Sequence, residues 1–312
     1  MKTTVTNNPK IAAAFIKAGE IAAFPTETVY GLGADAYNEK AVKKIFKAKG
    51  RPVDNPLIVH IANKKDINVL AQEITPSAKK IISKFFPGPV TVILKKNEII
   101  PPATTAGLDT IAIRMPAGRL AQQLIKAAGV PIAAPSANLS GSPSPTNFLH
   151  VLRDFNNKIP CLLIGPPAKY GLESTVIDCT GKNPVILRPG SVTLEQIKKL
   201  DKNAVIQKKG GKIKSPGQKY KHYSPKADVR IINVKREMSN VKRNEAFIGL
   251  DRNLGKGFEK VLICRSMNDY ARKLFSFFRE CDDEGIKTIW CQKVAEKGIG
   301  AAIMNRLNKA IH

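Results

Sequence analysis

Apolar and polar positions follow one another in short blocks that predict both strands and helices. Residues 9–19 have helical spacing, and residues 39–50 predict a second helix with apolar residues on one face, lysines on the other and Gly50 at its end. Further helices are expected at 64–72, 76–86 and 118–128, and strands at 20–25, 57–61, 90–94, 110–114, 131–135, 162–164, 174–179 and 184–190. Because helices and strands do not alternate strictly, we expect a mixed α/β domain and not a regular doubly wound sheet.

The pattern changes near residue 208. Residues 208–226 contain seven lysines, no acidic residue and repeated Gly, Pro and Ser, which predicts a linker. Beyond it, strand-like segments at 228–234, 246–250, 260–264 and 287–291 alternate with helical segments such as 268–281. This alternation predicts a smaller Rossmann-like domain with a parallel sheet. We therefore divide the chain into a first domain at 1–207, a basic linker at 208–227 and a C-terminal domain at 228–312.

The composition fits two packed domains with an anionic partner. The 312 residues are 43% hydrophobic, and 51 Lys and Arg against 25 Asp and Glu give a net charge of +26. This excess favours a nucleotide, a nucleic acid or a membrane surface, although a general basic bias of the proteome would produce it without any polyanion. The five cysteines form no C-x-x-C pair, so we expect reduced core cysteines and neither a disulfide scaffold nor a Cys-only zinc site.

Targeting signals are weak. The N-terminal apolar patch is too short for a signal peptide, and the chain lacks a run of about 18 apolar residues that could span a membrane. A soluble cytoplasmic protein is therefore expected.

The segment KAKGRPVDNPLIVH (47–60) places several cations beside a rigid turn. Lys47 and Lys49 could complement the negative end of the preceding helix. Arg51 lies beyond Gly50 and is restrained by the following proline, which suits bidentate contact with phosphate. Asn55 lies between Asp and Pro and is similarly restrained. Phosphate binding and an ordinary surface helix end both remain open from these residues alone.

Four other segments carry candidate chemistry. FPTETVYGLGADA (24–36) predicts a strand followed by a glycine-containing turn whose hydroxyl and amide groups could bind a small polar ligand, or a plain connection. APSANLSGSPSPT (134–146) is a serine-rich loop after a strand, or a linker. Arg114 and Arg188 each end an apolar strand shortly before a proline, and together with Arg51 they suggest a converging anion site. His60 lies inside an apolar strand, where histidine is more often structural than catalytic.

The fourth segment, SPGQKYKHYSP (215–225), places Tyr220, His222 and Tyr223 in the predicted linker. Aromatic residues in a basic tether suggest that it folds over a ligand as a lid, or that it stacks on RNA.

Taken together, these segments resemble one family. PTETVYGLGADA, KAKGRPVDNPLIVHI, PGPVTVIL, TIAIRMP, APSANLSG, ESTVID, LRPG and SPGQKYKHYSP occur in the order found in threonylcarbamoyl-AMP synthases of the long, two-domain type. The resemblance is dense over 20–230 and continues at 298–310. It implies a YrdC-like domain, which is a twisted open α/β sheet with a positively charged concave face, followed by a linker and a smaller Rossmann-like domain.

The resemblance also implies an activity. A nucleotidyltransferase of this family makes L-threonylcarbamoyladenylate and pyrophosphate from L-threonine, bicarbonate or CO2, and ATP, with Mg2+ carried by the ATP phosphates. A separate transferase complex then moves the threonylcarbamoyl group to the adenosine next to the tRNA anticodon. An anionic carbamate must attack an anionic α-phosphate, so fixed cations are needed between the two.

The resemblance implies site residues position by position. Lys49 and Arg51 would be catalytic. ATP would contact Arg51, Asn55, Thr110, Ser136, Asn138, Ser144, Arg188 and Tyr223. L-Threonine would contact Thr28, His60, Arg114, Ala134 and Ser174. No metal ligand is expected from the protein itself.

Two rival interpretations remain at this point. A YrdC-like domain also serves carbamoyl-transfer enzymes of hydrogenase maturation, but those chains add acylphosphatase and zinc-finger modules that this cysteine pattern does not offer. An RNA-binding protein without catalysis would also suit the net charge of +26. A protein that binds only phosphate, however, needs no amino-acid pocket built from Thr28, His60, Arg114 and Ser174.

Overall fold

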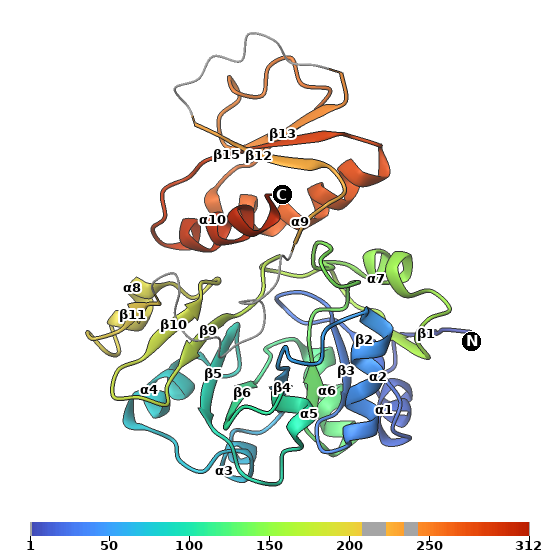
Figure 1. Cartoon of the computed structure of the whole chain (residues 1–312), viewed down its shortest axis with the longest axis vertical. Coiled ribbons are helices and arrows are strands. Elements are labelled where there is room, and N and C mark those ends of the chain that lie inside the picture. Colours follow the sequence, from blue (N-terminus) through green and yellow to red (C-terminus); the bar gives the residue numbers. More distant parts are fainter. Residues whose placement is uncertain (1, 208–222, 234–242, 312) are drawn as a thin grey trace.

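The computed structural model describes residues 2–207, 223–233 and 243–311, and Figure 1 shows two sheets stacked along the long axis of the molecule. The strands of the first sheet are β1 (Thr4–Thr6), β2 (Ala22–Phe24), β3 (Gly31–Asp35), β4 (Ile58–His60), β5 (Val90–Lys95), β6 (Thr110–Arg114), β7 (Ile132–Ala134), β8 (Cys161–Leu163), β9 (Thr175–Asp178), β10 (Val185–Arg188) and β11 (Val205–Ile206). Its helices are α1 (Pro9–Lys17), α2 (Glu39–Lys49), a 3-10 turn at Lys64–Asp66, α3 (Ile67–Leu70), α4 (Pro76–Phe85), α5 (Pro102–Thr105), α6 (Arg119–Ala128), α7 (Phe148–Phe155) and α8 (Leu194–Lys198).

The first sheet is mixed, as the irregular alternation of elements predicted. Its strand order is β1-β8-β2-β3-β7-β4-β6-β5-β9-β10-β11. The pair β4 and β6 is parallel, whereas β7 runs antiparallel to β4 and β5 runs antiparallel to β6. Segments that are distant in sequence therefore become neighbours in the middle of this sheet.

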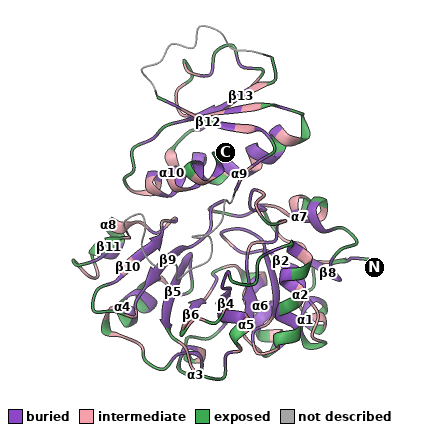
Figure 2. Cartoon of the chain, in the orientation of Figure 1, coloured by how far each residue is buried: buried purple, intermediate pink, exposed green. Residues whose placement is uncertain are grey.

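Pleating divides the central strands between a packed face and a second face. Val59, Ile113 and Ala133 belong to the main hydrophobic core, whereas Ile58 and Ala112 pack in a small cluster apart from it. Because side chains alternate along a strand, the residues two positions from Ile58 and Ala112, which are His60 and Arg114, share their face. Figure 2 shows that these central strands are buried.

The second sheet is smaller and entirely parallel, as predicted for the C-terminal part. Its strands are β12 (Asp228–Ile232), β13 (Glu245–Gly249), β14 (Lys260–Ile263) and β15 (Thr288–Gln292), in the order β12-β15-β13-β14. Helices α9 (Met267–Asp283) and α10 (Ile299–Ala310) lie between this sheet and the first one (Figure 1). Their apolar faces form a second core that includes Phe275, Phe278 and Leu307.

Several elements differ from the expectations. The prediction of a glycine-containing turn after Thr28 is wrong for Gly31–Asp35. These residues form strand β3, which runs antiparallel to β2. Gly33 is needed there for packing, since a Cβ at this position would lie 2.5 Å from the side chain of Ile132 and 2.8 Å from that of Phe24. The short elements β1, α5, α7, α8 and β11 were not predicted. Residues 208–222 of the expected linker lie outside the described part of the chain.

Within the described residues, no helix has the length and apolar character that crossing a membrane requires.

Candidate active site

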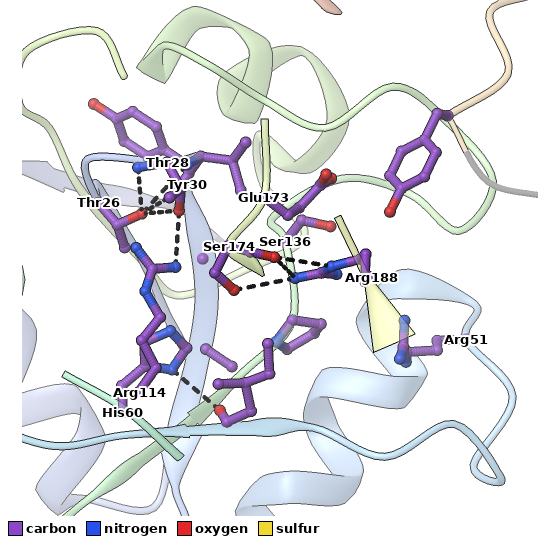
Figure 3. A pocket seen from close by; sticks show the side chains of 16 residues that line it. Thr26, Thr28, Tyr30, Arg51, His60, Arg114, Ser136, Glu173, Ser174 and Arg188 are labelled. Carbon is purple, nitrogen blue, oxygen red and sulfur yellow. Dashed lines mark hydrogen bonds between the residues drawn. The ribbon is translucent and has the colours of Figure 1, made fainter. Parts of the chain in front are cut away.

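A cavity opens on the second face of the central sheet, and its wall comes from segments spread over the first domain, together with Tyr223 beyond it (Figure 3). The lining residues are Thr26, Thr28, Val29, Tyr30, Gly31, Arg51, Ile58, His60, Arg114, Ala134, Pro135, Ser136, Glu173, Ser174, Arg188 and Tyr223. Nine of the residues predicted for the site are therefore brought together here, namely Thr28, Arg51, His60, Arg114, Ala134, Ser136, Ser174, Arg188 and Tyr223.

Arg51 is placed by the end of helix α2. Gly50 adopts a left-handed conformation with φ of 59°, and the amide of Arg51 donates to the carbonyl of Phe46 over 3.0 Å. This hydrogen bond closes a Schellman-type end and turns the chain away from the helix axis. The guanidinium Nη2 donates to the carbonyls of Asn55 and Pro56, both at 3.3 Å. Arg51 is thus a buried cation held at the cavity wall.

Arg114 ends β6 and is held from three sides. Its Nη2 donates to Glu27 Oε1 over 2.7 Å, its Nη1 to Thr28 Oγ1 over 2.8 Å and its Nε to the Gly88 carbonyl over 3.3 Å. Burial would raise the pKa of Glu27, but the charge and hydrogen bond of Arg114 hold that pKa below its usual value. Glu27 therefore carries a full negative charge that fixes the guanidinium in place.

Arg188 ends β10 and lies against the start of β9. Its Nη2 donates to the Ser174 carbonyl over 3.0 Å and to Ser174 Oγ over 3.2 Å. Ser174 Oγ also exchanges a hydrogen bond with Thr91 Oγ1 at 2.8 Å. The antiparallel pairing of β9 with β10 explains why two residues fourteen positions apart meet at the cavity.

His60 is a neutral member of the wall. Burial and the neighbouring charge of Arg114 lower its pKa to about 3, although Glu27 acts in the opposite direction. Its Nδ1 lies 3.1 Å from the Ile58 carbonyl, and its ring meets Phe24 edge-on with centroids 6.0 Å apart. At pH 7 this side chain contributes hydrogen-bonding capacity without charge.

Lys49 supports the serine-rich loop and does not line the cavity. Its Nζ donates to the carbonyls of Ser136, at 2.5 Å, and Asn138. Burial and the nearby charge of Arg51 lower its pKa well below the usual value. Asn138 in turn donates to the carbonyls of Leu139 and Ser142, at 2.7 and 2.9 Å, so the side chain of Lys49 helps to hold one rigid loop.

Asn138 and three further predicted ATP contacts lie outside the lining. Asn55 is buried in the turn that also accepts from Arg51. Thr110 begins β6, four residues before Arg114. Ser144 is fully buried and donates to Glu173 Oε1.

Tyr223 connects the cavity to the C-terminal part of the chain. Its buried ring stacks on Phe275 of α9, with centroids 5.2 Å apart, and the guanidinium carbon of Arg306 lies 5.4 Å from the ring centroid. Burial and the charge of Glu173 raise its pKa. The end of the predicted lid is therefore packed onto the cavity.

Sequence reasoning missed two carboxylates and the arginine that pairs with one of them. Glu27 and Glu173 lie directly before Thr28 and Ser174, so an acid next to a predicted site residue was a usable signal. Arg306 has an exposed fraction of 0% and pairs with Glu173. Its signal was an arginine surrounded by apolar residues in a helical pattern, since a buried charge requires a partner.

Comparison with known proteins assigns the chain. One family model, described as "Telomere recombination" and named for Sua5, YciO and YrdC, matches residues 14–190, and a second, "Threonylcarbamoyl-AMP synthase, C-terminal domain", matches residues 192–311. Threonylcarbamoyl-AMP synthase of Pyrococcus abyssi is 46% identical over 316 residues, which cover 96% of this chain and 93% of that protein. The chain belongs to the threonylcarbamoyl-AMP synthase family.

A second relative and a solved structure support the assignment. Threonylcarbamoyl-AMP synthase of Bacillus subtilis is 43% identical over 326 residues, covering 98% of this chain and 94% of the relative. The crystal structure of P. abyssi Sua5 complexed with L-threonine superposes with a TM-score of 0.88 at 42% identity, covering 99% of this chain and 97% of that one. The expected fold, a YrdC-like domain followed by a smaller α/β domain, is confirmed. The family does not favour the alternative of RNA binding without catalysis.

Proposed function

We propose that the chain is an L-threonylcarbamoyladenylate synthase, which converts L-threonine, bicarbonate or CO2, and ATP into threonylcarbamoyl-AMP and pyrophosphate, with release of water when bicarbonate is the carbon source. The observation that carries this proposal is that Arg51, Arg114 and Arg188 reach one cavity from three distant segments. Threonine carbamate and the α-phosphate are both anions, and two unit charges 4 Å apart repel by about 4 kcal/mol at an effective dielectric constant near 20. Cations fixed before the reactants arrive offset this repulsion without reorganisation during the reaction.

We assign the threonine half of the site to the part of the cavity around Arg114. The guanidinium fork would bind the threonine carboxylate, and Glu27 and Thr28 hold that fork in one orientation. Neutral His60, Ser174 and the Ala134 backbone would complete the pocket with hydrogen-bonding groups. The carbamate would then form on an amine whose position is fixed relative to the nucleotide.

We assign the nucleotide half to the part of the cavity around Arg51 and Arg188. These two cations would stabilise the charge that develops as the carbamate oxygen attacks the α-phosphate and pyrophosphate leaves. Ser136 and Tyr223 line the same region. The nucleotide would have to extend beyond the residues that line the cavity to reach Asn55, Thr110, Asn138 and Ser144. Lys49 would act by holding the loop that carries Ser136, together with Arg51 as the catalytic cation.

Mg2+ is part of the proposal as an ion carried by ATP. Glu173 is the one carboxylate among the described lining residues, and Ser144 and Arg306 already engage its two oxygens. Within the described residues there is also no group of three or more His, Cys, Asp or Glu side chains suited to a metal. The residues present therefore fit an ion held by phosphate oxygens and water, where it would neutralise phosphate charge.

The remaining parts of the proposal follow from the reaction. The product would pass to a transferase complex that modifies the adenosine next to the tRNA anticodon, in the cytoplasm, and tRNA itself could bind the basic surface. We keep the division into a catalytic domain at 1–207, a linker and lid at 208–227, and a C-terminal domain at 228–312 as a proposal.

Omission of each substrate in turn tests this function. Pyrophosphate release from ATP is measured with threonine, bicarbonate and ATP together, and then with threonine or bicarbonate left out of CO2-depleted buffer. We expect pyrophosphate only in the complete mixture, together with a threonine-containing adenylate. Release that continues at the same rate without threonine would refute the proposal.

A further inference from the structure

Arg306 is a fully buried cation that belongs to the C-terminal helix α10. Its neighbours on that helix, Ile303, Met304 and Leu307, lie in the second hydrophobic core. A charge in such surroundings is strongly disfavoured unless it is paired and hydrogen-bonded. Helix α10 can therefore carry a buried arginine at this position only because the guanidinium is paired and hydrogen-bonded.

Apart from Asn305 Oδ1 on α10 itself, the hydrogen-bond partners of Arg306 lie in the first domain, directly beside residues of the proposed site. Arg306 Nε donates to Glu173 Oε2 over 2.9 Å, and its Nη1 donates to the Pro189 carbonyl over 2.8 Å. Glu173 precedes Ser174 in sequence, and Pro189 follows Arg188. The guanidinium also lies over the ring of Tyr223. One side chain of α10 thus contacts three segments of the cavity wall.

The carboxylate of Glu173 poses an electrostatic problem in a cavity proposed for ATP. A negative charge there repels the phosphates unless a cation compensates it. Four charged or titratable side chains face Glu173, namely Arg188 of β10, Tyr223, and Arg306 and Lys309 of α10. Burial would raise the pKa of Glu173, but Arg306 and then Arg188 hold it below its usual value. Arg306 hydrogen-bonds to the carboxylate directly, through its Nε.

We propose that Arg306 is a positioning residue of the ATP site, which neutralises Glu173 and so leaves Arg188 available to the phosphates. Without Arg306, Arg188 would be drawn toward Glu173, and the cavity would lose a cation where the proposed chemistry needs one. The docked C-terminal helix would then be a condition for nucleotide binding. This inference rests on the proposed function, because it assumes that ATP occupies the cavity.

A second buried arginine provides a matched control. Arg279 of α9 pairs with Asp154 of α7 through two hydrogen bonds, of 3.0 and 2.7 Å, and also donates to the Pro143 carbonyl. The side chains of Arg279 and Asp154 are nearly as buried as those of Arg306 and Glu173. Neither Arg279 nor Asp154 lines the cavity. Loss of Arg279 therefore breaks a buried contact between the domains without removing a cation that hydrogen-bonds to Glu173. Because Arg279 also holds the Pro143 carbonyl and Asp154 accepts from the Leu139 amide, this variant also reports the effect of loosening the serine-rich loop.

The test compares Arg306→Met with Arg279→Met in the full-length chain. Binding of α,β-methylene-ATP is measured by calorimetry, and KM for threonine and for ATP by pyrophosphate release. We expect Arg306→Met to weaken analogue binding at pH 7.5 by tenfold or more, while Arg279→Met changes it by less than about threefold. The threonine KM should change little in either variant.

Two further measurements test whether Arg306 supports analogue binding by compensating the charge of Glu173. In the Glu173→Gln background, adding Arg306→Met should weaken analogue binding by less than about threefold, because no carboxylate then remains to be neutralised. In Arg306→Met itself, the loss should shrink as pH falls from 7.5 to 5.5, since Glu173 without this partner takes up a proton more readily. Arg306→Lys keeps a cation and should lie between wild type and Arg306→Met, which preserves the test if the Met variant does not fold.

Equal losses in Arg306→Met and Arg279→Met would overturn the proposal in favour of simple docking. A loss that persists in the Glu173→Gln background would overturn the electrostatic explanation. The proposed function fails separately, because a wild-type chain that binds the analogue but releases no pyrophosphate with threonine would contradict the synthase activity while leaving this inference standing. Wild-type chain that does not bind the analogue would overturn both.

Discussion

Arg114→Met is the substitution whose two effects can be worked out most fully from the structure. It removes the proposed fork for the threonine carboxylate. It also leaves Glu27 buried without its ion-pair partner, since the pair joins side chains with exposed fractions of 4% and 8% across 2.7 Å. Breaking a buried pair on one side costs about 3–5 kcal/mol of folding stability. Losing two charge-assisted hydrogen bonds to the threonine carboxylate costs about 3 kcal/mol of binding free energy. This corresponds to roughly a 100-fold rise in the threonine KM.

Glu27→Gln separates these effects because it breaks the same ion pair and keeps the guanidinium. Its amide oxygen can still accept from Arg114, so we expect a similar or smaller loss of stability and a rise in the threonine KM of less than about tenfold. Urea unfolding gives the stability of both variants, and pyrophosphate release at varied threonine gives the KM. The ATP KM should stay close to the wild-type value in both. An Arg114→Met enzyme with a normal threonine KM would refute the placement of threonine, as would equal KM changes in the two variants.

Three other substitutions test separate parts of the site. Arg188→Met should lower kcat for pyrophosphate release by about 100-fold or more, with a smaller change in the threonine KM, because it removes a cation that acts on the developing phosphate charge. Lys49→Met should lower turnover by roughly 100-fold and raise the ATP KM, since two carbonyls of the loop at Ser136 and Asn138 lose their donor and the loop shifts relative to the nucleotide. His60 is neutral in the folded protein down to about pH 3 but takes up a proton near pH 6.5 when unfolded, so it lowers stability as pH falls below 6.5. His60→Gln should therefore lose less stability between pH 6.5 and 4.5 than the wild type in urea unfolding, and equal losses would contradict the buried neutral histidine.

The helices were predictable where local signals agreed. Asn38 caps α2 through its side chain, lysines occupy the exposed face, and Gly50 ends the helix in the left-handed conformation. The strands bearing His60, Arg114 and Arg188 were visible as short apolar runs. Local rules could not reveal that β4, β6 and β7 lie side by side, because that order is decided by long-range packing of segments up to about 75 residues apart.

The residues of the site, and the convergence of its three arginines, were predictable, whereas the contacts between them were not. The position of Arg114 and Arg188 at strand ends suggested that they converge with Arg51 on one anion site, and the fold places all three in one cavity. The fold also shows that Lys49 donates to two carbonyls of a loop, a contact that motif spacing could not predict. The pairing of Glu173 with Arg306 could not be predicted, because Arg306 lies 133 positions away in helix α10.

The most direct test of the central claim is a crystal structure of the chain with L-threonine and α,β-methylene-ATP bound together. The account predicts both ligands in the one cavity, with the threonine carboxylate on Arg114 and the α-phosphate within hydrogen-bonding distance of Arg51 and Arg188. A nucleotide bound elsewhere, or an α-phosphate that touches neither of these two arginines, would contradict it.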